Sequence, residues 1–228
     1  LTDSSGNGQH ATTVLGTVTY TTGIDGQAAV FNGSTVIAMP NDTIRNNPDF
    51  TLSLRFKTTA SNMPIVGYQN APFAQPNTAA NYIPIVGILP SGELKVTLWT
   101  GSSAFSVQSA AAVNDDVWHR VDVVADTTNG SLEAFLDGSS IGQQASSVDH
   151  IDMSFNYLGG SRSQNYFAVD TYTGALDLLS LSNDAQVPPP PVPQVQATPV
   201  PTLPGLGLLG LGLMMGLVGR ARIKRRGA

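Results

Sequence analysis

Residues 50–56, FTLSLRF, decide the fold class of this chain. Every second side chain from Phe50 to Phe56 is large and apolar, and those between them are polar. A period of two places the apolar side chains on one face of a β-strand. Residues 118–124, WHRVDVV, alternate as well, with Val121 and Val123 on the face opposite to Asp122. Both stretches are therefore predicted to be strands.

Similar runs of alternating or apolar β-forming residues recur before residue 187. Turn pairs such as Asn32-Gly33 and Asp137-Gly138 separate them. No segment in this region shows a sustained apolar period of 3.6 residues. We therefore predict an all-β body, built as a sandwich of two antiparallel sheets, with almost no helix. The further runs are residues 28–31, 36–39, 82–89, 94–99, 105–108, 117–125, 132–136, 155–158 and 176–181.

The composition changes after residue 186. The next fifteen residues hold seven prolines, which favour an extended stalk. A charge-free apolar run then begins at Leu203, and it predicts one transmembrane helix. Gly212 and Gly216 form a pair of small residues that suits packing against another helix. The predicted organisation is a body at residues 1–186, a stalk at 187–201, a transmembrane helix at 202–219 and a basic tail at 220–228.

Charge is distributed unevenly along the chain. Six basic and sixteen acidic residues precede Pro201, whereas the tail that opens with Arg220 and Arg222 holds five basic residues and no acidic one. The positive-inside rule predicts that this tail stays in the cytoplasm and that the body faces out. An acidic body lacks the electrostatic footprint of a nucleic-acid-binding protein, so nucleic acid is excluded as a partner. Because no signal sequence follows Leu1, we expect an export signal that was removed or precedes this residue.

The C-terminal segment resembles a known class of sorting tail. Residues 200–219, VPTLPGLGLLGLGLMMGLVG, are followed by RARIKRR. This order is similar to the PEP-CTERM and VPTL/IPTL tails of Gram-negative bacteria, although Thr202 and Leu203 stand where the commonest motif has Glu and Pro. The resemblance implies recognition by an exosortase-type membrane protease. It places the chain as a single-pass protein of the bacterial inner membrane, in contact with the lipid bilayer, with its body in the periplasm or at the cell surface.

The body carries a second resemblance. Six stretches, in order, are similar to the laminin-G-like, concanavalin A-like family, which implies a jelly-roll sandwich. That fold hosts lectins, adhesive modules and glycoside hydrolases, so it implies no single activity. The stretches are DSSGNG at residues 3–8, GQAAVFNG at 26–33, FTLSLRFK at 50–57, NDDVWHRV at 114–121, LDG at 136–138 and GALDLLSLS at 174–182.

Calcium is the cofactor that this resemblance implies. Residues 3–9, DSSGNGQ, form an oxygen-rich loop of the kind that suits a hard cation. In similar domains the first Asp of this loop and an Asp of the last strand meet at one metal, positions that correspond here to Asp3 and Asp177. Asn7 is expected to complete this structural Ca²⁺ site. The alternative is an Asx-turn without an ion.

The sequence argues against catalysis. A glycosidase needs two carboxyl groups across the scissile bond, and glucanases of this fold usually place them on one strand. Neither Glu93 nor Glu133 has an acidic partner two positions away. The chain has no cysteine, and its three histidines share no metal-ligand spacing. We therefore expect no enzyme activity.

A ligand site is predicted around residues 69–81, a loop rich in Asn, Ala, Pro and Gln. Tyr68, Phe73 and Tyr82 are expected to present aromatic surface there to a glycan or a protein. The alternative is that Tyr68 and Tyr82 are strand residues with buried rings. Residues 165–172, NYFAVDTY, are a second candidate surface, for which core packing is expected.

These observations predict a membrane-anchored, extracytoplasmic adhesion or binding module without catalysis. A different class stays open, in which the chain is a structural accessory subunit of a larger membrane-protein complex. Retention of the C-terminal helix separates the two, because a sorted adhesin loses it and a subunit keeps it.

Overall fold

The computed structural model describes residues 2–188, which form strands and no helix. The anchor predicted at Leu203, Gly212, Gly216, Arg220 and Arg222 lies outside the described residues. Among residues 2–188 nothing helical has the length and apolar character to cross a membrane. The strands are β1 (Thr12–Leu15), β2 (Thr19–Thr22), β3 (Gln27–Asn32), β4 (Val36–Ala38), β5 (Phe50–Lys57), β6 (Met63–Gln69), β7 (Tyr82–Ile88), β8 (Glu93–Trp99), β9 (Ala104–Ala112), β10 (His119–Asp126), β11 (Ser131–Leu136), β12 (Ser139–Ala145), β13 (Phe155–Leu158) and β14 (Thr173–Ser182).

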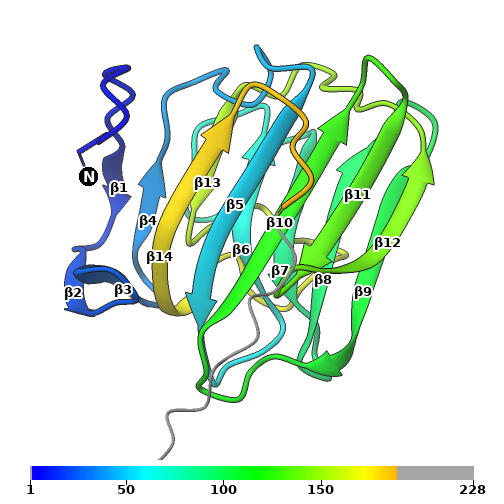
Figure 1. The fold of residues 1–228 in the computed structure, drawn as a ribbon. Coiled ribbons are helices and arrows are strands. Elements are labelled where there is room, and N and C mark those ends of the chain that lie inside the picture. The colour runs from blue at the N-terminus through cyan, green and yellow to red at the C-terminus, as the bar shows by residue number, and fades with distance from the viewer. Residues whose placement is uncertain (1, 189–228) are drawn as a thin grey trace, which may run out of the picture. The chain divides into compact units, whose positions relative to one another are not determined.

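The strands form two seven-stranded sheets that pack face to face (Figure 1). The first sheet has the order β1-β4-β13-β6-β7-β8-β9, and the second has the order β12-β11-β10-β5-β14-β3-β2. Every described strand pair in both sheets is antiparallel. The predicted all-β sandwich is therefore confirmed.

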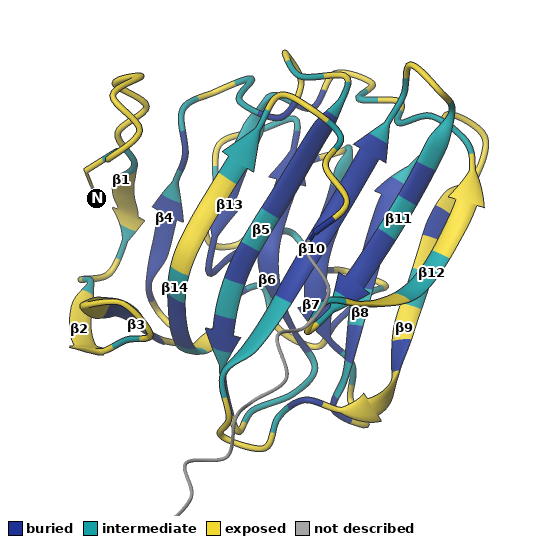
Figure 2. Cartoon of the chain, in the orientation of Figure 1, coloured by how far each residue is buried: buried dark blue, intermediate teal, exposed yellow. Residues whose placement is uncertain are grey.

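The core lies between the sheets, and β5 shows how the sequence builds it. Phe50, Leu52 and Phe56 are fully buried in the core, whereas Ser53 and Arg55 point to the outer face. Burying a side chain of this kind contributes roughly 1.5–3 kcal/mol. β5 and β10 form the dark-blue centre of the second sheet in Figure 2, and β2 and β12 are its yellow edges. The alternation predicted for residues 50–56 is thus confirmed.

Four strands carry no recognisable strand pattern in the sequence. β1, β2 and β12 are mostly exposed and polar, because they lie at or near sheet edges and bury little surface. β6 is buried at all seven positions, so it has no alternating pattern, and Pro64 within it argues against a strand. A register irregularity follows Pro64 in the pairing with β7.

β6 is buried on both sides because the connection between β13 and β14 covers the outer face of the first sheet. A Cβ atom on Gly67 of β6 would lie 2.2 Å from the carbonyl oxygen of Gly160. On Gly87 of β7 it would lie 2.3 Å from Cζ of Phe167. Glycine at these two positions therefore lets the connection lie directly on the sheet. This close packing positions the candidate site described next.

Candidate functional site

Two tyrosines and two cations meet on the outer face of the first sheet. Tyr82 opens β7, and Tyr166 lies in the β13–β14 connection, with their ring centroids 6.0 Å apart and the rings inclined at 76°. The guanidinium carbon of Arg162 lies 4.8 Å from the centroid of Tyr82. The ammonium of Lys95 lies 5.7 Å from the centroid of Tyr166. These four residues are called the tyrosine platform below.

Strand register explains why Lys95 reaches this face. Its neighbours Leu94 and Val96 are fully buried in the core, so the side chain of Lys95 leaves β8 on the opposite side. The cross-strand partner of Lys95 is Gly87, on which Phe167 packs. Phe167 is 8% exposed and adjoins Tyr166 in the chain. The sheet therefore fixes both Lys95 and the segment that carries Tyr166.

A buried amide pair fixes the other side of the platform. Gln69, which is fully buried, accepts hydrogen bonds at Oε1 from the backbone N–H of Arg162 at 2.9 Å and from Nδ2 of Asn77 at 3.0 Å. Its Nε2 donates to the carbonyl oxygen of Ala71 at 2.7 Å. Gln69 thus joins β6, the 70–81 loop and the β13–β14 connection. The guanidinium of Arg162 also donates to the carbonyl oxygen of Ala79.

The β13–β14 connection is closed on itself by a carboxylate. Asp170 Oδ1 accepts hydrogen bonds from the backbone N–H of Ser163 at 2.8 Å and from its hydroxyl at 2.6 Å. The N–H of Tyr166 donates to the carbonyl oxygen of Ser163 at 2.7 Å. Burial raises the pKa of the Tyr166 phenol, and the ring is half-buried. The platform is therefore held in place before any ligand arrives.

The structure separates the three aromatic residues that the sequence grouped. Tyr68 is 2% exposed, its hydroxyl lies 3.0 Å from Nδ1 of His150, and burial raises its pKa. It therefore presents no ring to solvent and matches the alternative of a buried strand residue. Phe73 is half-buried with its ring centroid 5.7 Å from that of Tyr157. Tyr82 alone of the three lies on the platform.

The partners of Tyr82 were not identified from sequence. Within residues 165–172, Phe167 and Tyr172 are buried as expected, whereas Tyr166 packs against Tyr82. Arg162 and Lys95 come from two further segments, and no short motif connects them to either tyrosine. Only the aromatic content of residues 165–172 signalled this surface.

The predicted calcium residues have other partners in the structure. Asp3 accepts the N–H of Ser5 at 2.8 Å and that of Gln9 at 2.9 Å, and the hydrogen bonds from Ser5 lower its pKa to about 2. Asp177 Oδ2 accepts the N–H of Ile24 in the β2–β3 turn at 2.7 Å. Among residues 2–188, no three His, Asp or Glu side chains cluster as metal ligands. Calcium binding by Asp3, Asn7 and Asp177 stays a prediction.

The two glutamates considered for catalysis lie on different sheets. Glu93 is in β8 of the first sheet and Glu133 in β11 of the second. Glu133 points away from the core, because its neighbours Leu132 and Ala134 are core residues. A hydrogen bond from Ser91 lowers the pKa of Glu93, which is the wrong direction for a general acid. This pair cannot flank one glycosidic bond.

Solved structures share this architecture at low sequence identity. Domain 4 of a GH43 extracellular arabinanase from Geobacillus stearothermophilus, in complex with arabinotriose, is similar with a TM-score of 0.58 and 18% identity over 81% of this chain and 87% of that one. The CBM40 of a Ruminococcus gnavus sialidase, bound to α2,3 sialyllactose, is similar with a TM-score of 0.51 and 20% identity over 63% of this chain and 80% of that one. The binding domain of botulinum neurotoxin DC, in complex with rat synaptotagmin II, is similar with a TM-score of 0.55 and 14% identity over 81% of this chain.

The last of these matches spans only 46% of the toxin chain. Identities this low show a shared fold alone. No match was found among curated proteins. The model of one family, described as the concanavalin A-like lectin/glucanases superfamily, matches residues 31–188, which is more than half of the chain. With its two antiparallel seven-stranded sheets, the chain belongs to the concanavalin A-like lectin/glucanase superfamily.

Proposed function

We propose that this sandwich is a non-catalytic binding module that takes a glycan on the tyrosine platform. The observation that carries the proposal is the pair Tyr82 and Tyr166 with Arg162 and Lys95 beside them. Aromatic rings offer apolar surface to the C–H face of a sugar, and cationic groups donate hydrogen bonds to its oxygens. Because Gln69 and Asp170 hold the platform segments in place, little ordering accompanies binding.

Neighbouring structures support a glycan as the ligand class. The arabinanase domain is in complex with arabinotriose, and the sialidase domain is bound to sialyllactose. Both domains belong to other proteins, so the sugar bound here is a separate question. The toxin domain in complex with synaptotagmin makes a protein the alternative ligand.

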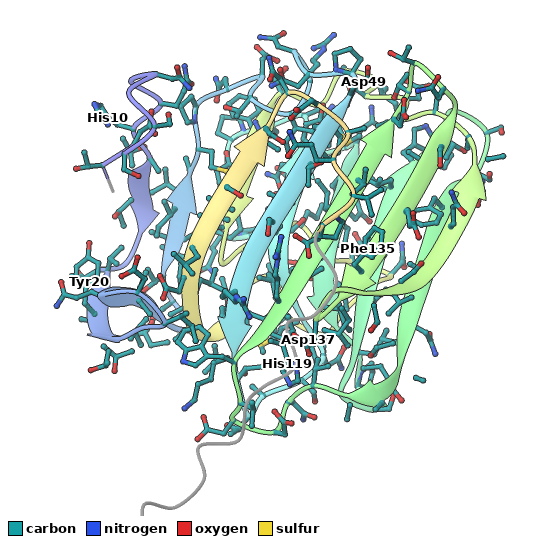
Figure 3. The ribbon with its side chains drawn as sticks, viewed as in Figure 1. His10, Tyr20, Asp49, His119, Phe135 and Asp137 are labelled. Carbon is teal, nitrogen blue, oxygen red and sulfur yellow. The ribbon has the colours of Figure 1, made fainter. Side chains whose placement is uncertain are left out.

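A glycan array probed with the full chain tests this proposal. We expect Tyr82→Ala and Tyr166→Ala each to weaken binding by about tenfold or more, because each removes aromatic contact area. Tyr166→Phe should retain most of the affinity. Tyr20→Ala is the matched control, since Tyr20 is 52% exposed on the edge strand β2 of the other sheet (Figure 3). Unchanged binding in both platform variants would reject the platform as the site.

We further propose that residues 202–219 anchor the module in the inner membrane with the sandwich outside the cytoplasm. The charge-free apolar run from Leu203 and the basic residues from Arg220 support this topology. The intact mass of the protein extracted from membranes tests it. A mass that includes Ala228, with partners at fixed stoichiometry, would favour a structural subunit of a larger complex. A mass that ends near Val200 would favour a processed surface module.

Calcium is proposed as a structural ion at Asp3, Asn7 and Asp177. Support comes from the oxygen-rich loop at residues 3–9. If the ion binds, adding calcium raises the melting temperature and a chelator reverses the effect. Asp3→Ala should abolish the response, whereas Asp25→Ala, a nearby carboxylate outside the proposed set, should retain it. Equal melting temperatures with calcium and with chelator would exclude the ion.

A further inference from the structure

A polar cleft opens beside the β4–β5 connection, and it shares no residue with the tyrosine platform. Its volume is about 690 Å³, which is within the range of small-molecule sites. Three segments form it: the N-terminal loop, the β4–β5 connection and the end of β14 (Figure 1). It is lined by Asn7, Gln9, Asn41, Asp42, Thr43, Asn46, Asn47, Leu181, Ser182 and Asn183, and is called the amide cleft below.

Most of the amide side chains in the cleft have no protein partner. Within residues 2–188, five of them are exposed and make no hydrogen bond through their side chains. Each amide offers two N–H donors and one carbonyl acceptor. The cleft thus concentrates unused donors and acceptors that come from three separate segments. These five are Asn7, Gln9, Asn41, Asn46 and Asn183.

The segments that carry these amides are held by other contacts. The N–H of Asp42 donates to the carbonyl oxygen of Ser154 at 2.7 Å, and Asn47 Nδ2 donates to the carbonyl oxygen of Thr43 at 2.6 Å. Ile44 is fully buried beneath the same connection. The carboxylate of Asp3 bridges the N-terminal loop. The amides are therefore presented from a supported framework.

The chemistry of the lining selects the ligand. A sugar hydroxyl both donates and accepts a hydrogen bond, and so does a side-chain amide. Among residues 2–188 no cation lines the cleft and Asp42 is the one charged side chain there, so this part of the chain offers an anionic ligand no counter-charge. Of the described lining residues only Leu181 is apolar, which leaves little surface for a hydrophobic ligand. We propose that the amide cleft is a second binding site, which takes an uncharged oligosaccharide.

Titration calorimetry with linear neutral trisaccharides tests this inference, with arabinotriose, cellotriose and maltotriose as probes. The full chain is kept in a detergent without a sugar headgroup, because a glycoside detergent would compete. Asn46→Ala and Asn183→Ala each remove one amide from a different segment. We expect each to weaken binding of at least one trisaccharide by about tenfold. Gln144→Ala, an exposed amide on β12, is the matched control and should bind as the parent chain does.

The outcomes separate the cleft from the platform. If Asn46→Ala and Asn183→Ala lose trisaccharide binding while Tyr82→Ala retains it, the trisaccharide binds in the amide cleft. Loss in Tyr82→Ala with normal binding in both asparagine variants overturns the cleft and supports the platform. No binding of any neutral trisaccharide, or tighter binding of trigalacturonic acid than of the neutral probes, also overturns it. Unchanged melting temperatures show that each variant is folded.

Discussion

His119 lies between two carboxylates at the start of β10. Its Nδ1 is 2.8 Å from Oδ2 of Asp137, and its Nε2 is 3.1 Å from Oδ1 of Asp115. Figure 3 shows His119 and Asp137 together at one end of the second sheet. The hydrogen bond to Asp137, followed by that to Asp115, raises the pKa of His119. Two loops that are separate in sequence are thus joined through one imidazole.

This arrangement predicts a pH dependence of stability with a definite sign. Because the pKa of His119 is higher in the folded chain than its usual 6.5, its contribution is complete below that value and is lost as pH rises through the folded pKa. Burial lowers the pKa of His150, so the contribution of His150 to stability grows as pH rises and opposes that of His119 in the parent chain. The measurement is therefore the difference in melting temperature between parent and Asp137→Asn from pH 5.5 to 8.5. We expect this difference to shrink as pH rises.

Asn is the appropriate replacement because Asp137 has a φ of 51°, a conformation that Asn tolerates. The carboxylates themselves have lowered pKa values, so their contribution is lost only on acidification below their ordinary range near 3.8. The contribution of the two carboxylates to stability therefore stays constant between pH 5.5 and 8.5. A difference independent of pH would contradict the role given to His119.

Asp177 acts on the fold through backbone amides. It accepts the N–H of Ile24 at 2.7 Å and that of Leu178 at 2.8 Å. Asp177→Ala should lower the free energy of unfolding by about 0.5–1.5 kcal/mol even in the presence of chelator. Denaturant titration measures this, with Asp25→Ala as the control. If the loss of stability in Asp177→Ala disappears when chelator is present, the whole effect comes from a bound cation instead.

At the scale of elements, Gly87 determines how closely the β13–β14 connection lies on β7. In Gly87→Ala the new Cβ would meet Cζ of Phe167 at 2.3 Å and the carbonyl oxygen of Met63 at 2.8 Å. We expect a loss of about 1–3 kcal/mol in stability and weaker platform binding. Phe167→Leu in the same chain should recover part of that loss. Simple additivity in this double-mutant cycle would show that Gly87 and Phe167 do not interact.

The strands show what the sequence could predict and what it could not. β5 and β10 send alternate side chains into the core, so their composition alternates and predicted both strands. β6 is covered on its outer side by a distant segment, and nothing local signals that cover. The platform was missed for the same reason, because Tyr82 and Tyr166 meet only after the β13–β14 connection folds onto the sheet. Asn7 was assigned to calcium, but it also lines the amide cleft, which needs three segments brought together.

At the scale of the whole molecule, β14 completes the second sheet. It pairs with β5 on one side and with β3 on the other. A chain that ends at residue 172 should therefore fail to fold, whereas a chain that ends at residue 188 should keep the sandwich. Near-UV circular dichroism and limited proteolysis measure the difference. A native-like spectrum for the shorter chain would mean that the two halves of the sheet are stable without their shared strand.

The central place of β14 also has a consequence for biogenesis. More than a hundred residues separate β5 from β14 in the chain, which at ~5–20 residues per second corresponds to roughly 5–25 s of synthesis. During that interval β3 and β5 have no common neighbour to join them. The second sheet therefore cannot be completed until β14 has left the ribosome.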